Sequence, residues 1–360
     1  MLACFASNER ERVRVSCDAP TLVSKQKEKM SVITSIDDIF IGNEHSIPLN
    51  LDPTKLHTLL RKKENKHAAV QDICKEVTGF LLDNNVDSTE IFPQANLPFH
   101  MLDLGKVVLF IIDDYSKFNN KVLPKKYVEN LHFEWRKNGY RVIWIKKFEW
   151  EDLRKRQVLQ SLILHACGRT KNRVFARNTY AEIIPSIQLK EFFNKSSFYG
   201  FRNASFSACL RDKKTDEILM AISFGHPYYG KNKYGSDAVE CIRAASKPFT
   251  IIVGGMSKLM KFILSEFGTT FQTIVYYVDD SHYNSGSMDA LGFKFSHFAG
   301  GASHNVWIET GSMFMRTPAL HKEIMYMIKQ NEIAAIPDVG NSTFVFKTGN
   351  EIANASSTDT

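Results

Sequence analysis

The stretch from Thr250 to Phe293 holds the residues whose types and spacing are best suited to chemistry. An apolar run leads into Gly254-Gly255-Met256-Ser257-Lys258, and a helical run follows to about Phe267. A glycine turn between a strand and a helix leaves backbone N–H groups at the positive end of the helix, where a phosphate or another anion binds well. We therefore assign a cofactor-phosphate site to Gly254, Gly255, Ser257 and Lys258. The alternative is a plain strand-to-helix turn with Ser257 as its cap.

Three further side chains are candidates for proton transfer beside this turn. The next apolar run contains Tyr277 and ends on Asp279, which places both at the end of a strand. A carboxylate there could act as a general base or orient an amine, or it could simply cap the following turn. Glu240 precedes Arg243 by three residues, so the two would pair on one helical face. Glu240 is then either half of a structural ion pair or a third catalytic candidate.

Composition limits the class of protein. The chain has 360 residues, 44% hydrophobic and 24% charged, which is typical of a globular protein with two domains. No apolar run approaches the roughly 20 residues of a membrane span, and Met1 to Ser7 is too short for a signal-peptide core. Six scattered cysteines form no CxxC pair, which argues against a zinc knuckle or a disulfide framework. We expect an intracellular protein.

The positive charge is concentrated in one block. Residues 121–177 contain 15 Lys and Arg against 5 Asp and Glu, a local +10, so the rest of the chain carries +7 − 10 = −3. A basic block with interleaved aromatic residues is typical of a surface that contacts a phosphate backbone, although a solvated helix face is the alternative. The candidate DNA contacts are Lys146, Lys147, Arg154, Lys155, Arg156, Arg169, Arg173 and Arg177.

Hydrophobic periodicity predicts an α/β fold class. In the first half, the pattern predicts strands at 107–112 and 141–146 and helices at 51–63, 66–83, 124–137 and 150–166. In the second half it predicts strands at 174–184, 204–209 and 218–224, a helix at 186–194, a mobile loop at 226–236 and a helix at 317–330. We expect a disordered arm at 1–30, a first domain at 31–170, a second domain at 171–347 and a disordered tail at 348–360.

The order of elements in the second half resembles the core of the GNAT acyltransferases. The pattern is a strand, Gly-Gly-x-Ser-Lys-Leu, a helix, the strand ending on Asp279, and then Leu291-Gly292-Phe293. In that family, backbone amides after the central strand hold the pyrophosphate of coenzyme A. The resemblance implies a GNAT-like mixed-sheet domain and an acyl-CoA cofactor.

A wider resemblance covers Val174 to Trp307. The segments VFAR, FYGFRNAS, LMAISFG, VECIR, VGGMSKLMKF, VYYVDD and ALGFKF follow one another as in phage-encoded proteins labelled homing endonucleases, in which a nuclease domain related to very-short-patch repair precedes this one. The second domain also resembles, more loosely, DNA-modification proteins of the Mom type. This resemblance implies DNA as partner, the bacterial host cell as location, and an "E-x-x-R" element in which Glu240 lines the site.

The first half resembles the repair-type nuclease only in KVVLFII and NGYRVIWIKKFEWEDLRKRQVLQSLI. Such a nuclease uses a bound Mg²⁺ to activate water, and the residues that could hold the metal here are Asp103, Asp113 and Asp114. His100 and Glu76 could complete an altered site. The Trp-His element of that family is missing, so the alternative is a domain that has lost cleavage and kept DNA binding.

Three functions remain open from the sequence. The first is a DNA-acting transferase with a phosphate-bearing cofactor at Gly254 to Lys258 and proton transfer at Asp279. The second is a metal-dependent homing-type endonuclease. The third is a non-catalytic DNA-binding or interaction protein.

Overall fold

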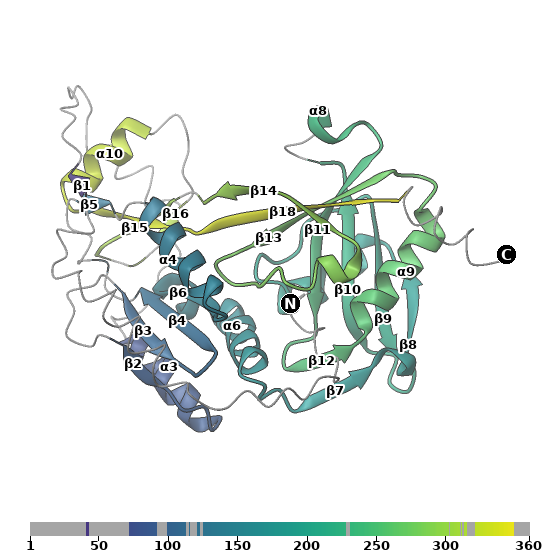
Figure 1. Cartoon of the computed structure of the whole chain (residues 1–360), viewed down its shortest axis with the longest axis horizontal. Helices are drawn as coiled ribbons and strands as arrows, with labels where there is room; N and C mark the ends of the chain where they lie inside the picture. Colours follow the sequence, from purple (N-terminus) through teal and green to yellow (C-terminus); the bar gives the residue numbers. More distant parts are fainter. Residues whose placement is uncertain are drawn as a thin grey trace. The chain divides into compact units, whose positions relative to one another are not determined.

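The computed structural model describes residues 41–42, 72–91, 99–112, 115, 121–122, 125–227, 231–301, 303–309, 311, 313–314 and 321–348. By their contacts these residues fall into two units (Figure 1). The N-terminal unit contains the described residues up to Glu151 together with those of 301–339, and the sheet unit contains 152–300 and those from Gly340 onward. The predicted domain boundary between residues 170 and 171 stays a prediction. By their contacts, residues 152–170 belong to the sheet unit.

A mixed sheet of seven strands forms the sheet unit (Figure 1), in the order β14-β18-β13-β11-β10-β9-β8. All neighbouring strands are antiparallel except β11 and β13, which run parallel. The predicted α/β class with a mixed sheet is therefore confirmed. The strand bounds are β8 Thr179–Ile183, β9 Phe206–Asp212, β10 Ile218–Gly225, β11 Ala238–Ser246, β13 Thr273–Asp279, β14 Lys294–Gly300 and β18 Gly340–Lys347.

The parallel pair is joined by a crossover that contains the predicted glycine turn. After β11 the chain forms β12 (Thr250–Val253), turns at Gly254 and continues as α9 (Gly255–Phe267) before it returns as β13. β12 pairs in parallel with β7 (Asn172–Phe175) in a separate two-stranded sheet. A crossover is required here because two parallel strands cannot be joined by a tight hairpin.

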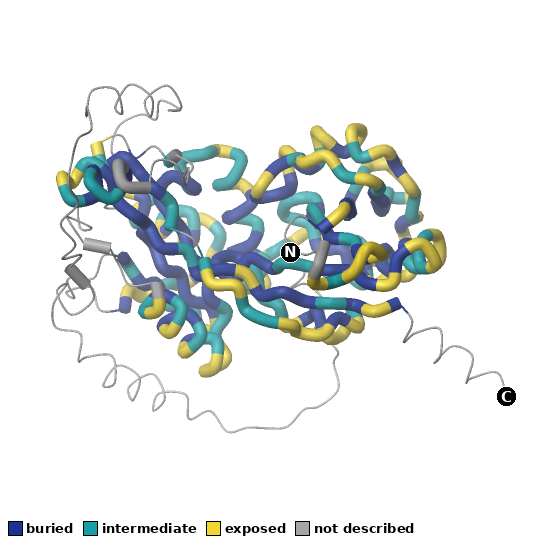
Figure 2. The backbone as a smooth tube through the Cα atoms, turned by 90° about the horizontal axis from the view of Figure 1, so that it is seen from above, coloured by how far each residue is buried: buried dark blue, intermediate teal, exposed yellow. Residues whose placement is uncertain are grey.

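Alternate residues of each strand point to opposite faces of the sheet, and both faces contribute buried apolar residues. Figure 2 shows how far each described residue is buried. On one side α9 contributes Met256, Leu259, Met260 and Ile263 to the larger apolar core. On the other side Leu189 and Phe193 pack against strand residues such as Ala221. The remaining elements of this unit are α6 Leu153–Ala166, η4 Ala176–Asn178, η5 Ser186–Leu189, α7 Lys190–Ser196, α8 Lys231–Tyr234 and η6 Asp289–Leu291.

Two predicted elements are divided in the structure. The strand expected at 174–184 is interrupted by η4, so β7 and β8 lie in different sheets. The helix expected at 150–166 is split between α5 (Lys147–Glu151) and α6. Asp152 separates them because its side chain accepts hydrogen bonds from the backbone N–H groups of Arg154 and Lys155 and so begins a new helix.

The N-terminal unit contains a four-stranded sheet in the order β2-β3-β4-β6, with β4 parallel to β6. The strands predicted at 107–112 and 141–146 and the helix ending at Lys137 are confirmed. The predicted helix at 51–63 lies outside the described residues. The bounds are β1 Ile41–Gly42, α3 Ile73–Asp83, β2 Thr89–Ile91, β3 His100–Asp103, β4 Val107–Ile112, β5 Lys121–Val122, α4 Lys125–Lys137 and β6 Arg141–Lys146.

The segment 301–339, which lies in the chain between β14 and β18, adds a three-stranded sheet to the N-terminal unit, in the order β16-β15-β17. Its elements are β15 Ser303–Trp307, β16 Met313–Phe314, α10 His321–Lys329 and β17 Ile333–Pro337. The helix predicted at 317–330 is thus present as α10. Among the residues that the structure describes, no helix has the length and apolarity needed to cross a membrane.

The buried His132 on α4 predicts a specific pH dependence of stability. Burial, and to a smaller extent Arg136, lowers the pKa of His132 from 6.5 to about 3, and its Nδ1 accepts a hydrogen bond from Trp144 Nε1 at 3.3 Å. The unfolded chain therefore binds the proton more readily between these two values. The contribution of the neutral His132 to the free energy of unfolding should be fully present above pH 6.5. It should decrease as the pH falls toward 3, by at most about 1.4 kcal/mol per pH unit.

Urea unfolding of the wild type and of His132→Gln, measured from pH 4 to 7.5, tests this. The glutamine amide can still accept from Trp144 but does not titrate, so the variant should lose this part of the pH dependence. An identical slope in both proteins would exclude His132 as the cause.

Candidate functional site

The parallel strands β11 and β13 separate beyond Glu240. Their register contains only three pairs and ends at Glu240↔Val275. On its other side, β11 has an irregularity against β10, where Ser223 pairs with Arg243 and Phe224 pairs with Cys241. Ile242 is therefore an extra residue of the kind that bends a strand and increases its twist. The bulge lies at the point where β11 turns away from β13.

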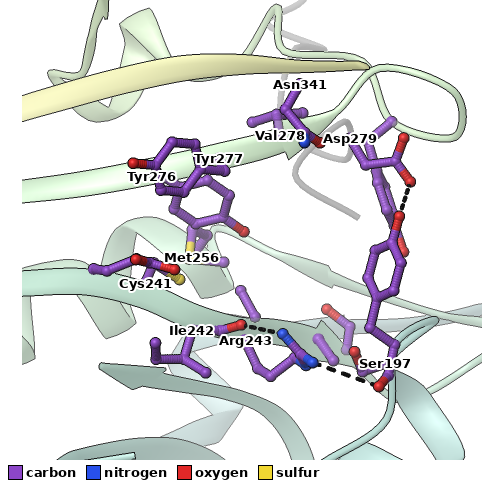
Figure 3. A pocket seen from close by; sticks show the side chains of 16 residues that line it. Ser197, Cys241, Ile242, Arg243, Met256, Tyr276, Tyr277, Val278, Asp279 and Asn341 are labelled. Carbon is purple, nitrogen blue, oxygen red and sulfur yellow. Dashed lines mark hydrogen bonds between the residues drawn. The ribbon is translucent and has the colours of Figure 1, made fainter. Parts of the chain in front are cut away.

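The gap between the two strands is a cavity of ≈ 320 Å³. Residues 240–246 of β11 form one wall and 276–279 of β13 form the other, with Met256 of α9 also lining it (Figure 3). Beyond Glu240, β13 offers β11 no ladder partner. The edges of β11 and β13 that face the cavity are therefore not paired with each other beyond this point.

A chain of hydrogen bonds connects the two separated strands. The Arg243 guanidinium on β11 donates to the carbonyls of Ile242 and Gly200, at 2.6 and 2.7 Å, and lies 5.8 Å from the centroid of the Tyr199 ring. The Tyr199 hydroxyl then donates to Asp279 Oδ2 on β13, at 2.5 Å (Figure 3). We call this chain the Arg243–Tyr199–Asp279 tie. It satisfies the carbonyl of the bulge residue and fixes the spacing of the cavity walls.

Asp279 lies at the cavity, as predicted, but its oxygens are already engaged. Besides the Tyr199 hydroxyl, its Oδ2 accepts from His282 Nδ1 at 2.6 Å, and its Oδ1 accepts from the Ser281 N–H at 2.9 Å. His282 is buried and its ring lies 4.2 Å from that of Phe198. Both oxygens of this carboxylate are therefore occupied by hydrogen-bond donors of the chain itself. We interpret Asp279 as an anchor for Tyr199 and His282.

The other two catalytic candidates line the same cavity. Glu240 is 8% exposed, and burial raises the pKa of the Tyr277 hydroxyl to about 12, with Tyr234 and Glu240 adding to it. Burial also raises the pKa values of Cys241 and Tyr276, whose side chains are hydrogen-bonded to each other. The hydroxyls and the thiol of this wall are therefore neutral and can donate hydrogen bonds at pH 7. Glu240 lies on a strand, whereas the three-residue spacing to Arg243 had suggested a helix.

The glycine turn has the predicted geometry at its helix end. Gly254 has φ +74° and lies just before the helix. No side chain caps α9, so Ser257, which is exposed, does not act as the cap. At Gly255 a Cβ atom would lie 2.5 Å from Ile252 Cγ2, so only glycine fits between the turn and the core. The first N–H groups of α9 therefore form an end that suits an anion, beside the cavity wall at Met256.

Lys258 is placed differently from the prediction. Its ammonium donates to the backbone carbonyls of Ala176, at 3.0 Å, and Thr179, which ties α9 to the chain between β7 and β8. Burial lowers the pKa of Lys258, and Lys213 adds to this. An ammonium held by two carbonyls in this way positions the helix and is not directed at a cofactor phosphate.

The eight candidate DNA contacts differ strongly in exposure. Lys146 and Lys147 are buried in the N-terminal unit, where Lys146 pairs with Glu149 and Asp338 at 3.3 and 3.0 Å. A buried charge requires partners within the protein. These two ammonium groups are therefore not accessible to a phosphate backbone. β6 is buried on both faces up to its last residue, Lys146, which explains this difference from the prediction.

The remaining six candidates lie in the sheet unit. Arg154 donates to the carbonyls of Ser197 and Phe198 at 2.7 and 2.9 Å, and the Lys155 ammonium lies over the Phe198 ring. Arg156 is half-buried on α6. In contrast, Arg169, Arg173 and Arg177 are exposed. Only this last group is presented to solvent as a nucleic-acid surface requires.

The predicted Mg²⁺ site cannot be assembled from the described residues. Asp113 and Asp114 lie outside them, and Asp103 accepts a hydrogen bond from the Gly105 N–H at 2.8 Å in a turn. His100 pairs with Glu90, and Glu76 accepts from Trp150 Nε1. In the part of the chain that the structure describes, no three His, Cys, Asp or Glu side chains gather in a way that could hold a metal ion.

Two residues of the site were missed in the sequence, Tyr199 and His282. Tyr199 lies far from Asp279 in sequence, so only the fold brings the two together. His282 follows Asp279 by three residues, a spacing that could have indicated contact within a turn. Burial next to the ring of Phe198 could not have been inferred.

No protein-family model matches the chain, and no curated protein matches it. Among solved structures, the ribosomal-protein-S18-alanine N-acetyltransferase of Escherichia coli is similar over 47% of this chain and 94% of its own, at 9% identity and a TM-score of 0.31. An acetyltransferase of Bacillus subtilis in complex with CoA is similar over 47% of this chain and 98% of its own, at 10% identity and a TM-score of 0.27. Likenesses at such TM-scores carry no argument about activity.

The Arg243–Tyr199–Asp279 tie predicts energetic coupling between residues that are 80 positions apart. In a double-mutant cycle of Tyr199→Phe and Asp279→Asn, each single change should cost about 1–3 kcal/mol of unfolding free energy, because a partner loses its hydrogen bond. The double variant should be less destabilised than the sum, with a coupling of about 1 kcal/mol or more. Urea unfolding at pH 7 measures all four proteins, and strict additivity would show that the tie does not form.

Proposed function

We propose that the sheet unit transfers an acyl group from a coenzyme A thioester to an amine. The observation that carries the proposal is the cavity between β11 and β13, bounded by two unpaired strand edges and adjoining the uncapped start of α9. Its volume of ≈ 320 Å³ is at the lower end of the range for ligand sites, about 300–1,000 Å³.

The shape of the cavity favours an elongated ligand with two different ends. The N–H groups at the start of α9 suit the phosphates of such a ligand. Strand edges without partners hydrogen-bond to an extended chain that contains amides, as an added strand would. Coenzyme A has both features, a phosphate-bearing nucleotide and an arm with two amide bonds. The residues present fit it through Gly254, Gly255 and the edges of β11 and β13, without a contribution from Lys258.

The side chains of the cavity fit the proton transfers of an acyl transfer. When bound, acyl-CoA would supply a thioester carbon that an amine can attack. Glu240, a carboxylate at the cavity wall, accepts the proton that the amine loses as the new C–N bond forms. Tyr277, whose hydroxyl is neutral, would supply a proton to the sulfur of the leaving coenzyme A thiol. Asp279 keeps Tyr199 in place through its hydrogen bond to the Tyr199 hydroxyl.

Ligand-induced stabilisation tests the cofactor assignment. Coenzyme A at about 100 times its dissociation constant should stabilise the wild type by about 2.7 kcal/mol, measured as a rise in the melting temperature. Ala244→Phe places a ring in the cavity and should abolish the stabilisation. Gly79→Ala on α3, where an added Cβ meets no atom within 4 Å, is a control that should keep it.

Thiol release from acetyl-CoA in the presence of a panel of amines tests the reaction. Glu240→Gln should retain the stabilisation by coenzyme A and lower the rate of transfer by about 10²-fold or more. Stabilisation that survives Ala244→Phe would place the ligand elsewhere, and transfer that is unchanged in Glu240→Gln would remove the proposed base.

A further inference from the structure

The exposed face of β7 and the 3-10 turn η4 carries a row of cations around one aromatic side chain. Lys171, Arg173, Phe175 and Arg177 are all exposed and follow each other at every second residue. Val174, on the opposite face of the strand, packs against the larger apolar core. Within β7, this alternation places Arg173 and Phe175 on the outward face. Lys171 precedes the strand, and Arg177 of η4 lies against the Phe175 ring. We call these four residues the β7 stripe.

The β7 stripe has no acidic neighbours in the chain. From Leu153 to Ala181 there are seven Lys and Arg residues and no Asp or Glu. Within the described part of the chain, none of the three cations of the stripe forms an ion pair. Their charge is thus not neutralised locally, and it attracts a polyanion.

Phe175 is placed unusually for a large apolar residue. It is 43% exposed between two arginines, and the Arg177 guanidinium lies 5.0 Å from its ring centroid. Proteins that bind single-stranded nucleic acid combine a basic track for the backbone with exposed aromatic rings on which bases stack. The bases of a duplex are stacked on one another and cannot stack on such a ring, so the ring favours a single strand.

The stripe leads to the proposed transfer site. β7 runs parallel to β12, with Phe175 beside Val253, the residue just before the glycine turn (Figure 1). The two hydrogen bonds of the Lys258 ammonium to Ala176 and Thr179 fix this end of the stripe against α9. At about 3.3 Å per residue, an extended chain from Lys171 to Phe175 is about 13 Å long. This length allows the stripe to contact several successive phosphates of one strand.

We propose that the β7 stripe binds a single-stranded nucleic acid, with phosphates on Lys171, Arg173 and Arg177 and a base on the Phe175 ring. Binding does not depend on acyl transfer. If the proposed function also holds, the bound strand is the carrier of the acceptor amine. DNA and RNA share the chemistry that the stripe recognises, so both belong in the test.

Fluorescence anisotropy with the full chain tests the proposal, using labelled 15-nucleotide DNA and RNA single strands and a DNA duplex at 50 to 300 mM salt. The variant Lys171→Gln/Arg173→Gln/Arg177→Gln should lose at least tenfold in single-strand affinity and lower the salt slope by about 2, since each phosphate contact contributes about 0.7. The control Lys190→Gln/Lys261→Gln/Lys294→Gln removes the same charge from exposed sites elsewhere and should change affinity less than twofold.

Phe175→Ala separates stacking from charge. It should weaken single-strand binding about tenfold with the salt slope unchanged, and leave the weaker duplex binding as it is. Equal losses in the two triple variants would overturn the proposal in favour of diffuse attraction. A stripe variant that loses coenzyme A binding but keeps the oligonucleotides would overturn it in favour of a cofactor surface. All the replaced side chains are exposed, and melting curves confirm that each variant folds.

Discussion

The Arg243–Tyr199–Asp279 tie is the interaction on which the site depends. Two parallel strands that separate inside a sheet expose backbone groups that would normally pair with each other, and such groups are costly to leave without partners. The strands separate at the bulge formed by Ile242. The Arg243 guanidinium donates a hydrogen bond to the Ile242 carbonyl. The connection through Tyr199 to Asp279 then limits how far the strands part. The result is a cavity whose width is set by hydrogen bonds.

The tie also explains why Asp279 is a poor candidate for a base. Its two oxygens already accept hydrogen bonds from Tyr199, Ser281 and His282, and a proton on the carboxylate would compete with these bonds. Glu240 lies at the last paired position, where the walls begin to part. We therefore propose a positioning role for Asp279 and a chemical role for Glu240.

The groups that we propose for phosphate binding lie at one end of the sheet unit. The start of α9 offers backbone N–H groups, and the β7 stripe offers cations a few residues away along a paired strand. Lys258 connects the two features without itself facing a ligand, because its ammonium is used to hold β7, η4 and β8 against the helix. A basic residue in a glycine turn thus contributes to architecture, while the exposed arginines that precede it in the chain supply the free charge.

The sequence by itself determined the features that depend on local rules. The strand at 107–112, the helix ending at Lys137 and the strand–Gly-Gly–helix–strand order around Gly254 follow from periodicity and glycine chemistry, and the structure has them. Arg169, Arg173 and Arg177 are exposed, and their contact with a nucleic acid stays a prediction. These properties depend on neighbours within a few residues.

Only the tertiary structure decided the rest. The bulge at Ile242, the approach of Tyr199 to Asp279 across 80 residues and the use of Lys258 as a structural donor all depend on which strands lie side by side. Lys146 and Arg173 look alike in sequence, but one ends a strand buried on both faces and the other lies on an exposed one. Local composition reports charge, whereas burial is a property of the assembled sheet, and the residues at a site take their roles from burial.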